Sequence, residues 1–401
     1  MHSRMKMAKI LLLLSSSLFC AASQPAKVII FPLDNLSRIG TLGWLNEGIA
    51  MSVSQQLRSR NVMVVDRAER IDLVESIDLP PGARISRASM IRVAQQAAAD
   101  LIVMGDYAGT EQNLKITIRV LDMRTLKLSG DMVANGSLAV LQQMENTLAW
   151  LILSNTSLEK ALSRDRFEER ARRIPNSPYS YYIQSLNLSD ENEQIKLLQK
   201  AVGLFNDFPE AQFRLGYLYY RKGDCGSAMP HLMLGRSGES TYLENEFMSG
   251  TCYLQGDQPA QAVQSFTRIL TYHRSFEILN NLAVAHLRRG DHILSLSSLL
   301  EARNLARTDP TVALNLAIVR HIQGNDPAAR GVLEDAIKTH SKNGMLQFLY
   351  SIVLRALGES EKAATAANRA KSLGIDVEKL QAADPGTWSR PFSTWDHPGA
   401  S

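Results

Sequence analysis

Small residues return at an almost constant interval in the second half of the chain, between about residues 175 and 377. The clearest marker is a glycine followed by a polar, mostly acidic residue, and successive markers lie 33, 34, 34 and 34 residues apart. A pair of residues that contains a small one precedes each glycine. A second small position lies twelve residues after this pair, and a third, mostly small position lies seven residues after the second. This pattern predicts a repeat array. Its markers are Gly223-Asp224, Gly256-Asp257, Gly290-Asp291, Gly324-Asn325 and Gly358-Glu359.

The small positions indicate pairs of antiparallel helices. Two helices joined by a tight turn approach within about 8–10 Å only where side chains are small, so each crossing point shows as a small residue. A 34-residue helix-turn-helix unit with this pattern resembles the tetratricopeptide repeat. The resemblance implies an all-α solenoid. Its six repeats would span residues 175–208, 209–242, 243–275, 276–309, 310–343 and 344–377, the first departing from the pattern at Tyr182 and Gln194.

The first half of the chain alternates short apolar runs with amphipathic segments, which predict strands and helices. Their order is strand, helix, strand, helix and then three strands. The third and fourth strands form a hairpin, and the fifth strand lies at an edge. This order predicts a small mixed α/β domain at residues 24–136, so the fold class is α+β with two domains. The predicted strands lie at 28–33, 62–65, 101–105, 114–120 and 126–136, and the main helices at 42–57 and 86–99.

Several blocks of this domain resemble the TolB amino-terminal domain and its relatives in bacterial envelope and flagellar assembly proteins. They occur in the family's order over residues 27–135 and read VIIFPLDNLS, LGWLNEGIAMSVSQQL, VMVVDRAER and AAADLIVMGDYAGTEQNLKITIRVLDMRTLKL. The resemblance implies a place in a cell-envelope assembly, and none of the matched blocks is catalytic.

Two further segments flank the repeat array. Residues 137–174 predict a connecting helix, because an apolar stripe is followed by charges of alternating sign. Prolines and glycine after residue 377 predict an extended tail at 378–401. Its Trp388, Phe392 and Trp395 give it apolar surface to bury, and we expect it to lie against the last repeat.

The first 23 residues have the order of a secretory signal peptide. Three basic residues precede an apolar run, and Cys20-Ala21-Ala22-Ser23 provides small residues for cleavage. A lipoprotein anchor on Cys20 is disfavoured, because Leu18 and Phe19 before it are bulky. No later apolar run approaches the roughly 20 residues needed to span a bilayer. We expect a periplasmic or secreted protein.

The composition argues against a nucleic-acid partner. The whole chain has 44 basic and 40 acidic residues, and three of the basic ones lie in the signal segment, which leaves 41 against 40. A general affinity for nucleic acid needs a clustered positive surface, and a nearly neutral chain does not favour one.

Candidate chemistry is sparse. Ser157 and Lys160 lie one helical turn apart without the companion motifs of a serine enzyme, and the histidines are scattered without ligand spacing, so we expect no catalytic, cofactor or metal site. Asp34-Asn35 and Asp66-Arg67 follow predicted strands, where α/β domains often bind ligands. The simpler interpretation of both pairs is loop capping and a structural ion pair.

A candidate partner-binding groove comes from the repeat register. In proteins that resemble this one, the first helix of each repeat lines the inner face. Aromatic and arginine side chains dominate interface energies, so this set predicts a groove for an extended or helical segment of another protein. Partial cover by neighbouring helices or by the tail is the alternative. The residues are Phe213, Tyr217, Tyr220, Arg221, Phe247, Thr251, Asn280, Val284 and Arg288.

A disulfide between Cys225 and Cys252 is a further hypothesis. Cys225 begins the second helix of one repeat, and Cys252 lies in the later half of the next repeat's first helix. These helix ends are expected to be neighbours, and a bridge requires their Cβ atoms to approach within about 4.5 Å.

The sequence therefore favours an exported, non-enzymatic scaffold that binds another protein or peptide. Two alternatives stay open. One is an envelope enzyme with an unrecognised site, and the other is a ligand-sensing component of a regulatory system.

Overall fold

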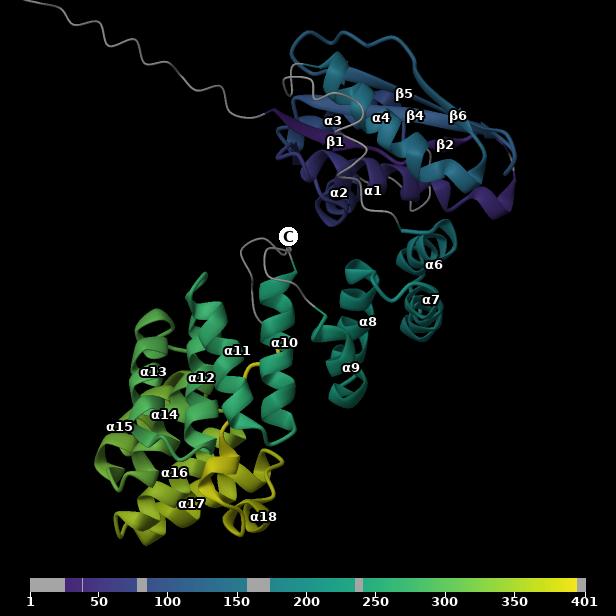
Figure 1. Ribbon diagram of the computed structural model, residues 1–401. Coiled ribbons are helices and arrows are strands. Elements are labelled where there is room, and N and C mark those ends of the chain that lie inside the picture. Colours follow the sequence, from purple (N-terminus) through teal and green to yellow (C-terminus); the bar gives the residue numbers. More distant parts are fainter. Residues whose placement is uncertain (1–25, 38, 78–84, 157–173, 235–240, 395–401) are drawn as a thin grey trace, which may run out of the picture. The chain divides into compact units, whose positions relative to one another are not determined.

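The protein is described by a computed structural model that covers residues 26–37, 39–77, 85–156, 174–234 and 241–394 (Figure 1). It divides into two compact units, with the boundary between Arg172 and Arg173. Each unit is described separately below.

The first unit contains a mixed sheet with the strand order β3-β1-β4-β5-β6. Strand β1 lies parallel to both β3 and β4, β2 extends the parallel pairing along β4, and β4, β5 and β6 form an antiparallel meander. The strands predicted from the apolar runs are all present, and the two-residue β2 is additional. The bounds are β1 Lys27–Ile30, β2 Asp34–Asn35, β3 Met63–Val64, β4 Leu101–Gly109, β5 Leu114–Asp122 and β6 Met132–Gly136.

Both faces of the central strands are buried, which explains their uninterrupted apolar sequence. Ile29 and Ile102 face a buried cluster that includes Val93 of α3. Val28 and Val103 point to the opposite face and are equally buried. Helix α4 packs against α1 and against β5 and β6. The helices are α1 Leu45–Arg58, α2 Arg67–Glu75, α3 Arg87–Gln96 and α4 Leu141–Asn155, with short 3-10 turns at Gly40–Leu42 and Leu138–Val140.

Helix α4 differs from the predicted connecting helix at 137–174. It belongs to the first unit, where Leu141, Leu148 and Ile152 are fully buried against the other elements. The sequence showed an apolar stripe, but it could not show that Glu145 and Asn146 are buried as well. The charged stretch after α4, at 157–173, lies outside the described residues.

The second unit is an array of six helix pairs, one in each predicted repeat (Figure 1). The helices of a pair pack on each other, and the second helix of a repeat packs on the first helix of the next. The pairs are α6 Asn176–Leu186 with α7 Glu191–Leu204, α8 Pro209–Arg221 with α9 Cys225–Leu232, α10 Tyr242–Gln255 with α11 Pro259–Leu270, α12 Phe276–Arg288 with α13 His292–Leu305, α14 Pro310–Ile322 with α15 Asp326–Thr339, and α16 Gly344–Ala356 with α17 Ser360–Ser372.

The small positions lie where the helices cross, as predicted. A Cβ atom added at Gly216 would come within 2.9 Å of Leu232, and one added at Gly250 within 2.8 Å of the Phe266 ring. The turn glycines mostly adopt the left-handed conformation that favours glycine, for example at Gly290 with φ +82°. In the third repeat the left-handed residue is instead Asp257, with φ 53°.

The first repeat packs like the others despite its atypical residues. Tyr182 is buried against Phe208, with ring centroids 5.0 Å apart. Gln194 is also buried, and two hydrogen bonds satisfy its carboxamide. Its nitrogen donates to the Leu188 carbonyl at 2.7 Å, and its oxygen accepts from Arg214 at 3.0 Å.

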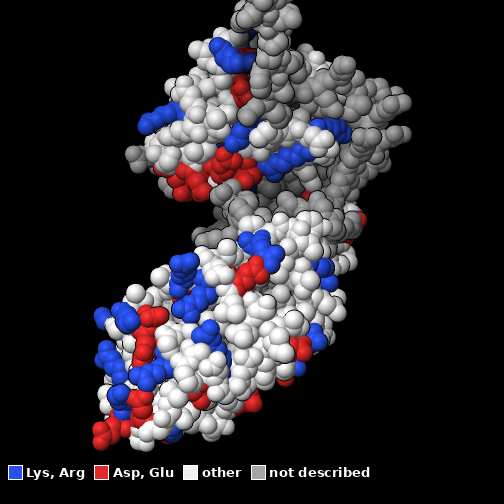
Figure 2. Space-filling view, turned by 90° about the vertical axis from the view of Figure 1, so that its left-hand side faces the viewer, with Lys and Arg blue, Asp and Glu red and all other residues white. Residues whose placement is uncertain are grey.

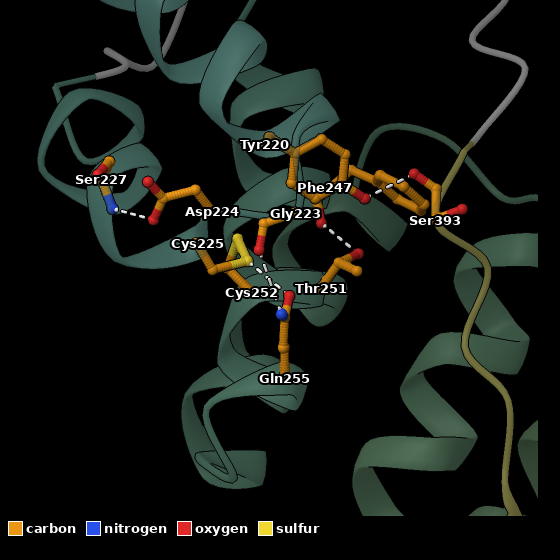
Figure 3. Close-up of a disulfide and its surroundings, with 10 residues drawn as sticks. All are labelled: Tyr220, Gly223, Asp224, Cys225, Ser227, Phe247, Thr251, Cys252, Gln255 and Ser393. Carbon is orange, nitrogen blue, oxygen red and sulfur yellow. Dashed lines mark hydrogen bonds between the residues drawn. A yellow bond between two sulfur atoms is a disulfide. The ribbon is translucent and has the colours of Figure 1, made fainter.

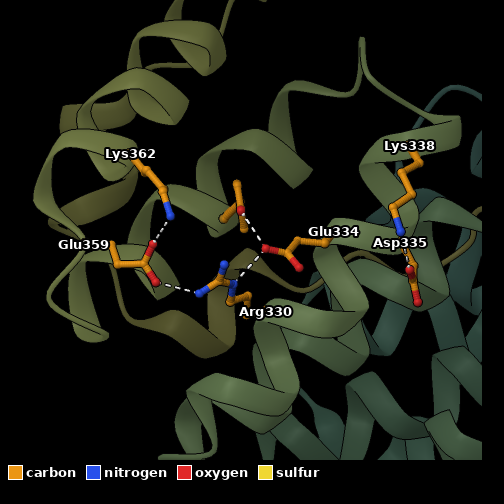
Figure 4. Close-up of polar contacts among 7 residues, drawn as sticks. Arg330, Glu334, Asp335, Lys338, Glu359 and Lys362 are labelled. Carbon is orange, nitrogen blue, oxygen red and sulfur yellow. Dashed lines mark hydrogen bonds and ion pairs between the residues drawn. The ribbon is translucent and has the colours of Figure 1, made fainter.

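An ion-pair network connects the last two repeats. Arg330 of α15 donates to Glu334 at 2.7 Å and to Glu359 at 2.5 Å, and Lys362 also bonds Glu359 (Figure 4). These side chains are partly exposed, so the network adds little stability and mainly joins α15 to the start of α17.

Candidate functional site on the first-helix face

The site lies on the face formed by α8, α10, α12 and α14, here called the first-helix face. After α17 the chain forms α18 (Val377–Gln381) and a 3-10 turn (Pro385–Trp388), and residues 389–394 then continue without helix or strand. This short segment, here called the tail segment, contacts α14 first, then α12 and finally α8.

Two asparagines bind the main chain of the tail segment. Asn315 of α14 accepts a hydrogen bond from the Arg390 N–H at 2.9 Å and donates one to the Arg390 carbonyl at 2.8 Å. Asn281 of α12 does the same for Phe392, at 2.7 and 2.9 Å. Each carboxamide thus offers one residue the donor and the acceptor that a neighbouring strand would offer. These bonds do not depend on the side chain of the bound residue.

A third asparagine completes the arrangement. The Asn280 amide donates to the Arg390 carbonyl at 3.1 Å, and its oxygen accepts from Asn315 at 2.8 Å. All three asparagine side chains are fully buried. Buried amides are costly unless they are hydrogen-bonded, so a main chain at this position satisfies groups that would otherwise need water.

Aromatic rings anchor this part of the chain at two points, one just before the tail segment and one within it. Trp388, which is 4% exposed, packs edge-on against Phe348 at 5.1 Å between ring centroids, and its Nε1 donates to the Leu380 carbonyl at 2.9 Å. Phe392 packs edge-on against Phe276 at 5.5 Å. Because Phe392 touches two apolar clusters of the array, it is the principal side-chain contact within the tail segment.

The far end of the segment reaches the second repeat. The Tyr220 hydroxyl donates to the Ser393 carbonyl at 2.6 Å, as Figure 3 shows. Burial raises the pKa of the Tyr220 phenol, so this group is protonated and can donate throughout the physiological range.

The predicted groove residues divide into two groups. The first group lies at the surface or against the tail segment. Asn280 and Tyr220 bind the segment directly, while Phe213 and Tyr217 are half-buried, with ring centroids 6.3 Å apart. Arg221 lies over the Tyr217 ring and pairs with Glu191 at 3.0 Å.

The second group belongs to the interior of the array. Phe247 and Val284 are buried in the cluster around Phe266, and the Thr251 hydroxyl donates to the Phe247 carbonyl at 3.0 Å. Arg288 donates to the Leu254 carbonyl at 2.6 Å, and burial lowers the pKa of its guanidinium. Arg288 thus holds α10 to α12, which differs from its predicted place among the partner-binding residues.

Sequence reasoning missed Asn281 and Asn315, and it gave cover of the surface by the tail only as an alternative. A signal was present, since the two asparagines lie 34 residues apart, each immediately before the small pair of its repeat. The tail was expected to lie against the last repeat, but hydrogen bonds span up to 173 residues in sequence and reach the second repeat.

Cys225 and Cys252 form a disulfide with a Cα–Cα distance of 5.3 Å. It joins the start of α9 to α10, and Gln255 reinforces this connection by donating to the Gly223 carbonyl at 3.3 Å (Figure 3). The bridge links the second and third repeats close to Thr251 and Tyr220, at the end of the surface that the tail segment reaches.

Other candidate groups have structural partners. Asp66 caps α2 by accepting from the Glu69 N–H at 2.7 Å, and Arg67 pairs with Glu47 at 3.4 Å. Asn35 accepts from the Ser37 N–H within its own loop at 2.9 Å. The pair Ser157 and Lys160 lies outside the described residues.

The described residues offer little that would bind a metal ion or a strongly charged partner. Among the described residues, His, Cys, Asp and Glu side chains do not gather in groups of three or more that could hold a metal ion. On the face drawn in Figure 2, basic and acidic side chains of the repeat array are interspersed. In the same described portion, every helix is too short or too polar to cross a membrane.

Comparison with known proteins returned helical-repeat structures. No protein-family model and no curated protein sequence matches the chain. MamA is 17% identical over 42% of this chain and 98% of its own, with a TM-score of 0.36. YrrB, described as a TPR protein with an unusual peptide-binding site, is 13% identical over 46% and 98%, with a TM-score of 0.37. The pilF protein of Pseudomonas aeruginosa is 16% identical over 51% and 97%, with a TM-score of 0.41. The assignment of the second unit as a helical-repeat array rests on its own helix pairs and on the regular spacing of their turns.

Proposed function

We propose that this protein is an exported, non-enzymatic interaction scaffold whose repeat array binds an extended segment of a partner polypeptide along the first-helix face. One observation carries the proposal. This face already binds an extended segment, using Asn281 and Asn315 to hydrogen-bond its main chain at alternate residues. Recognition of an extended main chain, with a side-chain anchor for specificity, is a recurring mode of peptide binding.

The cellular setting is proposed from the sequence. The charged, apolar and small-residue regions of residues 1–23 favour export to the periplasm or beyond. The resemblance of residues 27–135 to the TolB amino-terminal family favours docking of the α/β unit in a cell-envelope assembly. N-terminal sequencing of the mature protein tests the first point, and a chain beginning at Met1 or an acylated Cys20 would contradict it.

Site-specific crosslinking in cells tests the binding proposal. A photoreactive amino acid at Tyr217, one helical turn before Tyr220 on α8, is expected to crosslink a specific partner. The same group at Ile293, which is 80% exposed on α13, is the matched control for incidental contacts. Crosslinks of equal pattern and yield from both positions would contradict the proposal.

A further inference from the structure

The tail segment is bound as a ligand would be bound. Its main-chain hydrogen bonds go to side chains 75 to 173 residues away in sequence, on three different repeats. Ser389, its first residue, and Trp388 before it are buried as part of the end of the array, whereas the side chains of Arg390 and Ser393 are exposed. The segment therefore adds main-chain contacts and one ring, Phe392, to a surface that is already formed.

The residue types of the segment match this surface. Pro391 lies between Arg390 and Phe392, the two residues that the asparagines bind. A backbone N–H at this intermediate position would have no partner on the array. A proline there removes a donor that would be left without a partner and fixes φ near −65°, which favours an extended chain at its own and the preceding residue. Phe392 follows with the anchoring ring, and Ser393 offers its carbonyl to Tyr220. The surface thus fits any residue, then proline and then an aromatic residue.

We propose that the first-helix face is a recognition site for X-proline-aromatic segments of a partner protein, and that residues 390–394 are a tethered occupant which the partner replaces. This rests on the proposed function and specifies its ligand. A tethered segment acts at an effective concentration of about millimolar, so a free segment with the same contacts competes poorly. A partner gains the advantage by also contacting Tyr217 and Phe213, which lie one and two helical turns before Tyr220 on α8 and are half-exposed.

The test compares two truncated chains. One ends at Ser389, which removes the occupant and keeps the buried Trp388. The matched control ends at Thr394 and keeps the occupant. The probe is a fluorescent peptide with the sequence of residues 389–394, measured by anisotropy. We expect the chain ending at Ser389 to bind the peptide at least about ten times more tightly than the control. Replacing the phenylalanine of the peptide by alanine should abolish binding.

Several results would overturn the proposal. Equal affinities of the two chains, or no binding by a folded chain ending at Ser389, would do so. If that chain does not fold, full-length protein with Phe392→Asp serves instead, because it loosens only the occupant, and it too should bind more tightly than wild type. A full-length dimer in light scattering that disappears on truncation at Ser389 would make a second copy the occupant and would also overturn it.

The same experiment separates this inference from the proposed function. Peptide binding without any specific crosslink from Tyr217 in cells would leave the recognition site intact and contradict the scaffold. A specific crosslinked partner together with no peptide binding would contradict only the preference for proline and an aromatic residue.

Discussion

Asn281 and Asn315 lie one repeat apart in sequence, yet they bind residues of the tail segment that are only two positions apart. Two residues of extended chain cover about 7 Å, less than the 8–10 Å between packed helices. Asn280, the chain neighbour of Asn281, connects the two positions because its side-chain oxygen accepts a hydrogen bond from Asn315. One repeat of the array thus corresponds to two residues of a bound polypeptide.

Replacing both asparagines should release the tail segment while the array stays folded. In Asn281→Ala with Asn315→Ala, we expect the backbone amides of Arg390 and Phe392 to lose their protection from hydrogen exchange, because their acceptors are gone. Each lost pair of bonds should cost about 1–2 kcal/mol of docking free energy. The exposed Asn304→Ala is the control. Unchanged protection at Phe392 would show that the asparagines do not hold the segment.

A glycine at a helix crossing and an exposed glycine inside a helix should respond oppositely to alanine. Gly250→Ala should destabilise the array by about 1–3 kcal/mol, because the added methyl would meet the Phe266 ring. Gly331→Ala in α15 has nothing within 4 Å and should stabilise it by about 0.5–1 kcal/mol, since glycine weakens a helix interior. Denaturant unfolding measures both. The same sign of change in both variants would contradict the crossing assignment.

The first unit should lose stability as the pH rises. Burial raises the pKa of Glu145 from 4.5 to about 8, while its Ser52 hydrogen bond acts in the opposite direction. A carboxyl with a raised folded-state pKa stabilises the fold fully below about 4.5, and this contribution is lost as the pH rises toward about 8. Glu145→Gln should therefore change the melting temperature little at pH 4.5 and raise it at pH 8.

An exposed residue gives the control for that titration. Glu75→Gln, at the end of α2, should leave the pH dependence as in wild type. A Glu145→Gln variant whose melting temperature falls with pH as steeply as that of wild type would show that another group is responsible.

Loss of the disulfide should loosen the connection between the second and third repeats. The bridge closes a loop with a sequence separation of 27, and bridges over loops of this size typically contribute about 2–4 kcal/mol. Cys225→Ser with Cys252→Ser should lower the denaturant midpoint by a corresponding amount, and reducing agent should destabilise wild type but not the variant. Quantitative labelling of two thiols in unfolded, unreduced protein would show that the bridge is absent.

The repeat array could be predicted because its information is local. Gly290 and its equivalents recur with the helix-turn-helix period, and each marks a turn or a crossing that involves neighbouring residues only. The strands of the first unit were equally visible as short apolar runs. The position of α4 was not, because an apolar stripe does not say which element will cover it.

The candidate site could be predicted only in part. Register alone placed Tyr220 and Asn280 on the correct face, and both contact the tail segment. It could not show that Arg288 binds the Leu254 carbonyl, because an arginine has the same sequence signature whether it is free or bonded. Nor could it place the tail segment, since no local pattern connects Phe392 to Asn281.

The hydrogen bonds from the asparagine side chains to the main chain of the segment affect how a bound polypeptide is aligned on the surface. Because Asn281 and Asn315 recognise peptide groups rather than side chains, a bound polypeptide could slide by two residues and regain the same hydrogen bonds. The ring of Phe392, held against Phe276, is what fixes the frame. A polypeptide with aromatic residues at every second position would therefore occupy the surface in several alignments, and dissociation from one would often lead to capture in the next.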